Sequence, residues 1–183
     1  MKAPMQVQGL HHFAYKCRDA EETRHFWEDI VGLPLAHCFH ITGHKPTTGG
    51  DPVDYMHLFF EMGDGSYIAF FDLDDDQISA PSPNTAAWVN HIALQVASLD
   101  ELEAARKHLV ANGIEVAGPL DHGIVKSIYF FDPNGLRGEF TTRTCSREHD
   151  AEAKARAHDQ LANWQRRKTH AARPAAPTPV LQS

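Results

Sequence analysis

Hydrophobic and polar positions alternate along this chain with the period of a strand in some segments and with the period of a helix in others. The same order of strand-like and helix-like segments occurs twice. In the first half the pattern predicts a strand over residues 9–16 and a helix over residues 19–31, with Asp19 as N-cap and Glu22 three residues later. Gly32 ends this helix. Three extended stretches follow: residues 34–41, 55–62 and 66–72. The predicted order of elements is therefore βαβββ.

The second half repeats this order. A strand over residues 90–97 precedes a helix over residues 99–112 that Gly113 ends, and three strands follow: residues 114–117, 124–131 and 137–142. The predicted fold class is α+β, with two βαβββ modules forming a curled mixed sheet around a cavity, plus a C-terminal helix. We expect a tail, the first module, a linker, the second module and a C-terminal segment: residues 1–8, 9–73, 74–89, 90–143 and 144–183.

The C-terminal segment has a different composition from the modules. Residues 146–168 are rich in Ala, Glu, Lys and Arg, which predicts an exposed helix with Leu161 and Trp164 as its apolar anchors. This helix is expected either to cover a sheet edge or a partner subunit, or to be simply solvated. Residues 171–183 contain three prolines and are predicted to be disordered.

Composition excludes several classes of function. The net charge of −7 argues against nucleic acid as a partner, because a phosphate backbone is bound by clustered Lys and Arg. The chain shows neither a secretory signal nor an apolar run of the roughly 18 residues that a membrane span needs, so we expect a cytoplasmic protein without a membrane partner. Three cysteines without paired spacing predict reduced thiols: Cys17, Cys38 and Cys145.

Three residues at matched places in the repeat are candidate metal ligands. His12 and His91 each open a look-alike segment within the first strand of a module, His12-Phe13-Ala14-Tyr15 and His91-Ile92-Ala93-Leu94, and Glu139 lies in the last strand of the second module. Two imidazoles and a carboxylate can hold a divalent metal while leaving positions open for substrate and oxygen. Alignment of the turns before the last strands sets Ala69 against Glu139, so only one module carries the carboxylate. His11 competes with His12, but strand alternation is expected to turn it to the opposite face.

These residues resemble the vicinal oxygen chelate superfamily, which includes glyoxalase I, extradiol ring-cleaving dioxygenases, fosfomycin-resistance enzymes and bleomycin-binding proteins. The resemblance covers residues 9–142 and implies paired βαβββ units that curl around a metal cavity. It also implies that His12, His91 and Glu139 occupy the positions of the Fe(II) ligands of extradiol dioxygenases. The motifs that carry it are His12 with Asp19, the segment from Phe26 to Leu35, His91 with Leu99-Asp100, and Asp132-Pro133-Asn134-Gly135 leading to Glu139.

The resemblance favours one chemistry over its alternatives. Glyoxalase I enzymes usually carry a second carboxylate where this chain has Ala69, so our first hypothesis is an extradiol-type dioxygenase that cleaves a small aromatic vicinal diol with O₂. Fe(II) is the metal expected first, and Mn(II), Zn(II), Ni(II) or Co(II) could use the same ligands. The alternatives are a Lewis-acid metalloenzyme of the glyoxalase or fosfomycin-resistance kind, and a metal-free small-molecule binding or resistance protein. A homodimer is compatible with all three.

Ring cleavage also needs acid and base groups. Tyr129, on the strand before the ligand strand, matches a tyrosine of extradiol enzymes, whereas their acid-base histidine is replaced here by Ser66. The alignment puts His57 on the inward face as a candidate base, and His122 lies in a loop from which it could bind substrate oxygen. Each of these residues also has a purely structural alternative, and Arg137 is open between binding an anionic substrate and balancing Glu139. The cavity lining is expected to include Phe59, Tyr67 and Phe71.

Overall fold

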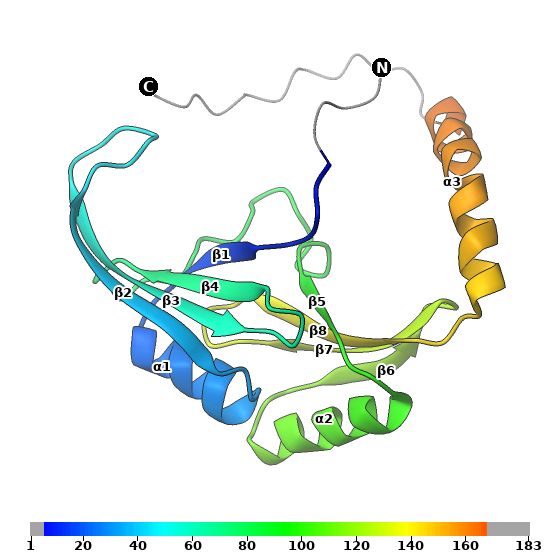
Figure 1. Cartoon of the computed structure of the whole chain (residues 1–183), viewed down its shortest axis with the longest axis horizontal. Helices are drawn as coiled ribbons and strands as arrows, with labels where there is room; N and C mark the ends of the chain where they lie inside the picture. Colours follow the sequence, from blue (N-terminus) through cyan, green and yellow to red (C-terminus); the bar gives the residue numbers. More distant parts are fainter. Residues whose placement is uncertain (1–5, 168–183) are drawn as a thin grey trace.

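Two four-stranded sheets and their helices form the body of the protein, and a long helix follows them (Figure 1). The structure is a computed structural model and describes residues 6–167 of the chain. The α+β class and the two βαβββ modules are confirmed. The predicted disorder of residues 171–183 lies outside the described residues, as does most of the predicted tail over residues 1–8.

The first module departs from its predicted helix. Asp19 is the N-cap as expected, since its carboxylate accepts a hydrogen bond of 2.6 Å from the Glu22 backbone N–H. The helix then widens into a π-helical turn and ends at Val31, after which Gly32 takes a positive φ of 89°. The elements are β1 (His12–Cys17), α1 (Ala20–Arg24), the π-helix η1 (His25–Ile30), β2 (Leu35–His44), β3 (Val53–Glu61) and β4 (Tyr67–Asp72).

The second module has a regular helix, and its second strand begins later than predicted. Ser98 caps the helix through its side chain, and Gly113 ends it with a φ of 79°. The strand predicted over residues 114–117 is wrong except at its last residue, because Ile114 bonds back to the Leu109 carbonyl and packs against the core. The elements are β5 (Ile92–Gln95), α2 (Leu99–Ala111), β6 (Ala117–Asp121), β7 (Val125–Phe131), β8 (Arg137–Arg143) and α3 (Arg147–Arg167).

The strands form two separate sheets with the same order. The first runs β1-β4-β3-β2 and the second β5-β8-β7-β6, so hydrogen bonds between strands do not join them into one curled sheet among the described residues. In each sheet the first and last strands of the module pair in parallel. The register sets Ala69 beside Phe59 and Glu139 beside Tyr129, which confirms the alignment drawn from the turns.

Packing on the helix-covered side joins the two modules. The ring of Phe26 lies 6.1 Å from Phe130 of β7, and Trp27 lies 5.8 Å from Phe70 of β4. The Trp27 indole N–H also donates to the buried Asp132 carboxylate at 3.2 Å. Helix α1 with η1 therefore sits between both sheets, and the opposite faces of the sheets are left for other contacts.

Helix α3 projects from the end of the second module (Figure 1). Its described side chains are exposed or only half-buried, as the composition predicts, and Leu161 keeps 56% of its surface. Within residues 6–167, no helix has the length and apolar character needed to cross a membrane.

Candidate functional site

His91 and Glu139 form a close pair on one sheet face. The His91 Nε2 atom lies 2.9 Å from Glu139 Oε2, and the Glu139 side chain is only 7% exposed. On the other edge of the imidazole, Nδ1–H donates to the Val89 carbonyl oxygen at 2.9 Å. Because a carbonyl can only accept, this bond places a proton on Nδ1 and, in the neutral ring, leaves the Nε2 lone pair toward the carboxylate.

The pair fits a divalent metal ion. Nitrogen and oxygen ligands at 2.0 to 2.2 Å from one metal, at a right angle to each other, are separated by about 3 Å. The observed 2.9 Å agrees with that separation. Metal-binding histidines also usually donate their second N–H to a carbonyl or carboxylate, as His91 does to Val89. The spacing and orientation of the pair are therefore compatible with two adjacent ligands of one metal ion, and an ion pair with protonated His91 has the same spacing.

His12 lies in the other module, beside different partners. Its ring is 5.5 Å from Phe59 and 6.5 Å from His57, and its Nδ1 is 2.8 Å from Nδ1 of His11. The expectation that His11 points to the opposite face is wrong, since the two rings touch. The reason is that β1 begins at His12, so strand alternation does not constrain the residue before it.

The structure brings together two of the three predicted ligands. Within residues 6–167 of one chain, no group of three His, Cys, Asp or Glu side chains is placed to hold a metal ion. His91 lines a cleft of about 460 Å³ that also borders Leu10 and Phe13, the residues on either side of the His11-His12 pair. His91 is therefore reached from this cleft, whereas Glu139 does not line it, and residues 6–167 of one chain do not complete the predicted triplet.

Tyr129 and His122 meet next to the pair. The Tyr129 hydroxyl is hydrogen-bonded to His122 Nε2 at 2.7 Å, and the Arg137 guanidinium lies 4.1 Å from the centre of the tyrosine ring. Burial, and after it the Glu139 carboxylate, raises the pKa of Tyr129. The phenol is therefore protonated at neutral pH. Arg137 stacks on Tyr129 and donates from its guanidinium to the Trp88 carbonyl, and neither contact is among the two roles weighed from the sequence.

His57 lies on the aromatic face of the first sheet, as predicted. Its ring is stacked on Phe71 at 3.7 Å between centroids and lies 4.2 Å from Phe59. The Nε2 atom is buried and finds no hydrogen-bond partner among residues 6–167. Burial, with a smaller contribution from His12, lowers the pKa of His57, so the imidazole is neutral at neutral pH. The candidate acid-base residues are thus divided between the two modules.

A family model covers most of the chain. The model of the Glyoxalase/Bleomycin resistance protein/Dioxygenase superfamily matches residues 9–140. The chain belongs to this superfamily. The matched region runs from the first module into β8 of the second, and α3 lies outside it.

Solved structures with the superfamily fold agree with this assignment. A glyoxalase family protein from Enterococcus faecalis is 26% identical, with a TM-score of 0.54, and the match covers 75% of this chain and 99% of that one. A glyoxalase/dioxygenase from Nostoc punctiforme is 22% identical with a TM-score of 0.56, covering 79% and 97%. The fosfomycin resistance protein FosX from Listeria monocytogenes is 23% identical with a TM-score of 0.53, covering 76% and 96%. The last two similarities show the fold alone.

Ser66 has a structural role in this superfamily member. It is only 4% exposed, and its hydroxyl donates to the Asp64 carboxylate at 2.6 Å. Its backbone N–H donates to the same carboxylate at 3.0 Å. Ser66 is therefore held in the turn before β4, at the position where extradiol enzymes carry their acid-base histidine.

The aromatic residues predicted to line the site share one face of the first sheet. The Phe59 and Tyr67 rings are 5.9 Å apart, and Phe71 is stacked on His57. The same face continues onto β2, where the His37 ring lies 6.1 Å from Phe59. This surface offers flat rings and imidazole nitrogens to a ligand.

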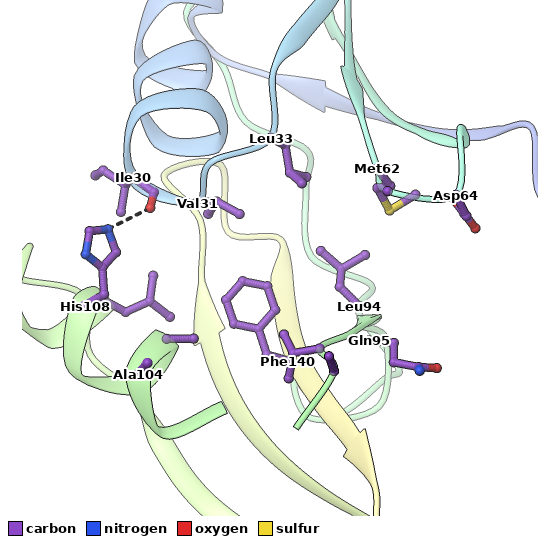
Figure 2. Close-up of a pocket in the computed structure, with 15 residues that line it drawn as sticks. Ile30, Val31, Leu33, Met62, Asp64, Leu94, Gln95, Ala104, His108 and Phe140 are labelled. Atoms are coloured by element: carbon purple, nitrogen blue, oxygen red, sulfur yellow. Dashed lines mark hydrogen bonds between the residues drawn. The ribbon is translucent and has the colours of Figure 1, made fainter. Parts of the chain in front are cut away.

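The protein also contains a cavity of about 980 Å³, which is lined by residues of α2, of the segment after η1 and of the strands that face them. Figure 2 shows apolar side chains around it, among them Leu33, Met62, Leu94 and Phe140. Phe140 and Glu139 are neighbours on β8 and point to opposite faces of the sheet. The cavity therefore lies on the opposite face of β8 from Glu139, and it adjoins the cleft that His91 lines, with which it shares Met62, Asp64, Leu94 and Gln95.

Proposed function

We propose that this protein is a metal-dependent oxygenase of the extradiol type, with Fe(II) as the metal expected first. The proposal rests on the His91–Glu139 pair, whose 2.9 Å spacing and Nδ1 anchor suit two adjacent ligands of one ion. We infer that the third ligand is His12 of a second copy, because one chain brings only two ligands together within residues 6–167. The functional unit is then a homodimer.

Bound at these ligands, Fe(II) would gather a small aromatic vicinal diol and O₂ at one centre and polarise both. Side chains of the protein beside the metal would donate and accept the protons that the reaction moves. The Tyr129 hydroxyl is placed to hydrogen-bond a substrate oxygen, and its 2.7 Å bond to His122 offers a path for that proton. Arg137 would hold the tyrosine ring in place by stacking on it.

The first sheet would supply the substrate's other surface. A flat ring fits against Phe59 and Phe71, the two residues that already enclose His57. In the tautomer that carries its proton on Nδ1, the His57 Nε2 atom, unpartnered among the described residues, would accept a hydroxyl proton of the substrate. We therefore propose His57 as the base that takes this proton while the aromatic face excludes water.

A Lewis-acid enzyme without redox chemistry is the second candidate. Ser66 favours it, because this turn residue is bonded to Asp64 and cannot replace the acid-base histidine of ring-cleaving enzymes. The same His91–Glu139 pair would hold Zn(II), Mn(II), Ni(II) or Co(II) for this chemistry. A fosfomycin resistance protein is among the structures with this fold. A metal-free binding or resistance protein is the third candidate. The ligand-type pair of His91 and Glu139 counts against it, because binding of a small molecule alone does not need such a pair.

Metal analysis and oxygen uptake separate these candidates. Protein purified without added metal and then loaded anaerobically with Fe(II) should hold about one ion per chain. On exposure to a panel of catechols it should consume O₂ and form a ring-cleaved product. Failure with every diol, despite bound metal, would support the Lewis-acid candidate. Absence of stoichiometric binding with any divalent metal would support the metal-free binding protein.

Mixed dimers test the shared site. The His12→Ala variant by itself should lose metal, and so should the His91→Ala variant by itself. Mixed and reassembled, they should regain about a quarter of the wild-type metal per chain, because half of random dimers are mixed and each has one intact site. A mixture that stays empty contradicts a site shared between copies. Wild-type metal in His12→Ala alone contradicts its role as a ligand.

A further inference from the structure

Two sulfur atoms touch on the face of the first sheet that lies opposite the candidate site. The Cys38 Sγ atom is 3.3 Å from the Sδ atom of Met56. We propose that Cys38, Met56 and His40 form a binding site for a soft monovalent metal ion, Cu(I). Such a site is independent of the metal centre proposed above.

Strand pairing places the third ligand beside the two sulfur atoms. His40 on β2 is the register partner of Met56 on β3, so their Cβ atoms lie about 5 Å apart on the same face. Cys38 precedes His40 by two residues and therefore points to that face as well. A thiol, a thioether and an imidazole thus project from one patch of the hairpin.

The patch does not share residues with the other face of the sheet. Cys38 pairs in register with Leu58, whose side chain is buried in the core on the helix-covered side. Phe39 and His57, which pair with each other, point to the aromatic face instead. Cu(I) at the sulfur patch would consequently not touch His12 or the rings around it.

The donor atoms select the ion. Thiolate and thioether sulfur are soft ligands that favour Cu(I) over Fe(II), Mg²⁺ or Ca²⁺, and imidazole also binds copper. On binding, the Cys38 S–H bond would lose its proton to solvent, and the thiolate charge would balance the single charge of Cu(I). No electron is transferred, so the step needs no oxidant or reductant.

The geometry needs only a small adjustment. With metal–sulfur bonds of about 2.3 Å, two sulfur ligands of a three-coordinate ion are about 4 Å apart. The observed contact of 3.3 Å must therefore widen by about 0.7 Å. Met56 can supply this change, because an unbranched thioether side chain has three rotatable bonds. Cys38 and His40 are exposed, so the ion can reach them from solvent.

The other thiols provide controls. Cys17 is fully buried, and burial raises its pKa to about 12, so it remains a thiol at neutral pH. Cys145 follows β8 in the second module and is partly exposed. A Cys145→Ser variant therefore removes one accessible thiol without altering the patch.

Anaerobic titration with Cu(I), in competition with a bathocuproine chelator, tests the proposal. Wild-type protein should bind one Cu(I) per chain at this patch and release about one proton. Cys38→Ser should weaken binding by roughly 100-fold or more, and Met56→Leu by about tenfold. His40→Ala should also weaken it, whereas Cys145→Ser should leave the affinity unchanged. X-ray absorption should show two sulfur atoms and one nitrogen at the copper.

Two outcomes would overturn the inference. One is wild-type Cu(I) affinity in Cys38→Ser, with circular dichroism showing that the variant is folded. The other is loss of Cu(I) binding in a His91→Ala/Glu139→Ala double variant, which would place the ion at the first metal centre. Conversely, a protein that fails to bind Fe(II) but keeps Cu(I) at Cys38 would disprove the proposed oxygenase while supporting the sulfur site.

Discussion

The two modules share one topology but carry opposite chemistry at the same place. In the first, register pairs Phe59 with Ala69, and in the second the equivalent pair is Tyr129 with Glu139. The first sheet face is consequently a surface of rings and imidazoles, whereas the second holds a buried carboxylate beside His91. A duplicated backbone thus provides equivalent positions, and a few substitutions decide which module carries a buried carboxylate beside a histidine.

The difference between Ala69 and Glu139 affects the free energy of folding because both positions are buried. Ala69 and Glu139 are both buried, with exposed fractions of 0% and 5%. A buried carboxylate is costly unless charges and hydrogen bonds compensate it. His91 is the partner that the structure provides, and a divalent ion would compensate the charge more fully. The second module therefore has a reason to bind metal that the first module lacks.

Loss of the pair should produce the largest effect. Glu139→Ala or His91→Ala should lower metal affinity by more than about 100-fold, since each removes a direct ligand. Elemental analysis after dialysis measures this loss, and circular dichroism checks that the fold persists. His37→Ala, which changes an imidazole on the first module's face, is the matched control and should retain metal. Full metal content in Glu139→Ala would show that the ligand assignment is wrong.

Much of this comparison could be predicted from the sequence. Matching the turn that ends at Gly65 with the one that ends at Gly135 was sufficient to align the last strands, because a positive-φ glycine fixes where each strand begins. From that alignment followed the pairing of Ala69 and Glu139 with their neighbours, as well as the shared face of His57 and His12.

Features that depend on packing between distant segments could not be predicted. The π-helix η1 places Phe26 and Trp27 between two sheets. The spacing of apolar residues within one helix does not reveal that its side chains must pack against two sheets, so the π-helical turn could not be predicted. The late start of β6 follows from Ile114 packing in the core. Likewise, sequence repeats align His12 with His91 but do not decide whether both ligands belong to one copy.

The turns before the last strands should differ strongly in their contribution to stability. Asp132→Ala should cost about 3 kcal/mol, because it leaves the buried N–H groups of Trp27, Asn134 and Leu136 without their acceptor. Asp64→Ala, at the matching exposed turn, should cost much less. Urea unfolding of both variants measures the difference. Equal losses would show that Asp132 does not tie the modules together.

Exchange of the Tyr129 and Phe59 side chains should affect turnover more modestly. Tyr129→Phe should lower the oxygenase rate by about tenfold or more while metal content stays unchanged, because it removes only the hydroxyl bonded to His122. Phe59→Tyr, the matched change in the first module, adds a hydroxyl to the surface proposed to hold the substrate ring, so it should change KM for the diol more than the rate at saturating diol. Steady-state oxygen uptake measures both. An unchanged rate in Tyr129→Phe would assign the tyrosine a packing role.

The smallest effect concerns the ion pairs of the two helices at low pH. Arg24, then His25, lowers the pKa of Asp29 to about 2, so this stabilisation is present above the ordinary value near 3.8 and is lost as pH falls toward 2. Arg24→Gln should therefore flatten the fall of Tm over that range. Arg106→Gln, at a simpler pair on α2, should flatten it less. Parallel Tm curves for wild type and Arg24→Gln would show that these exposed pairs add no stability.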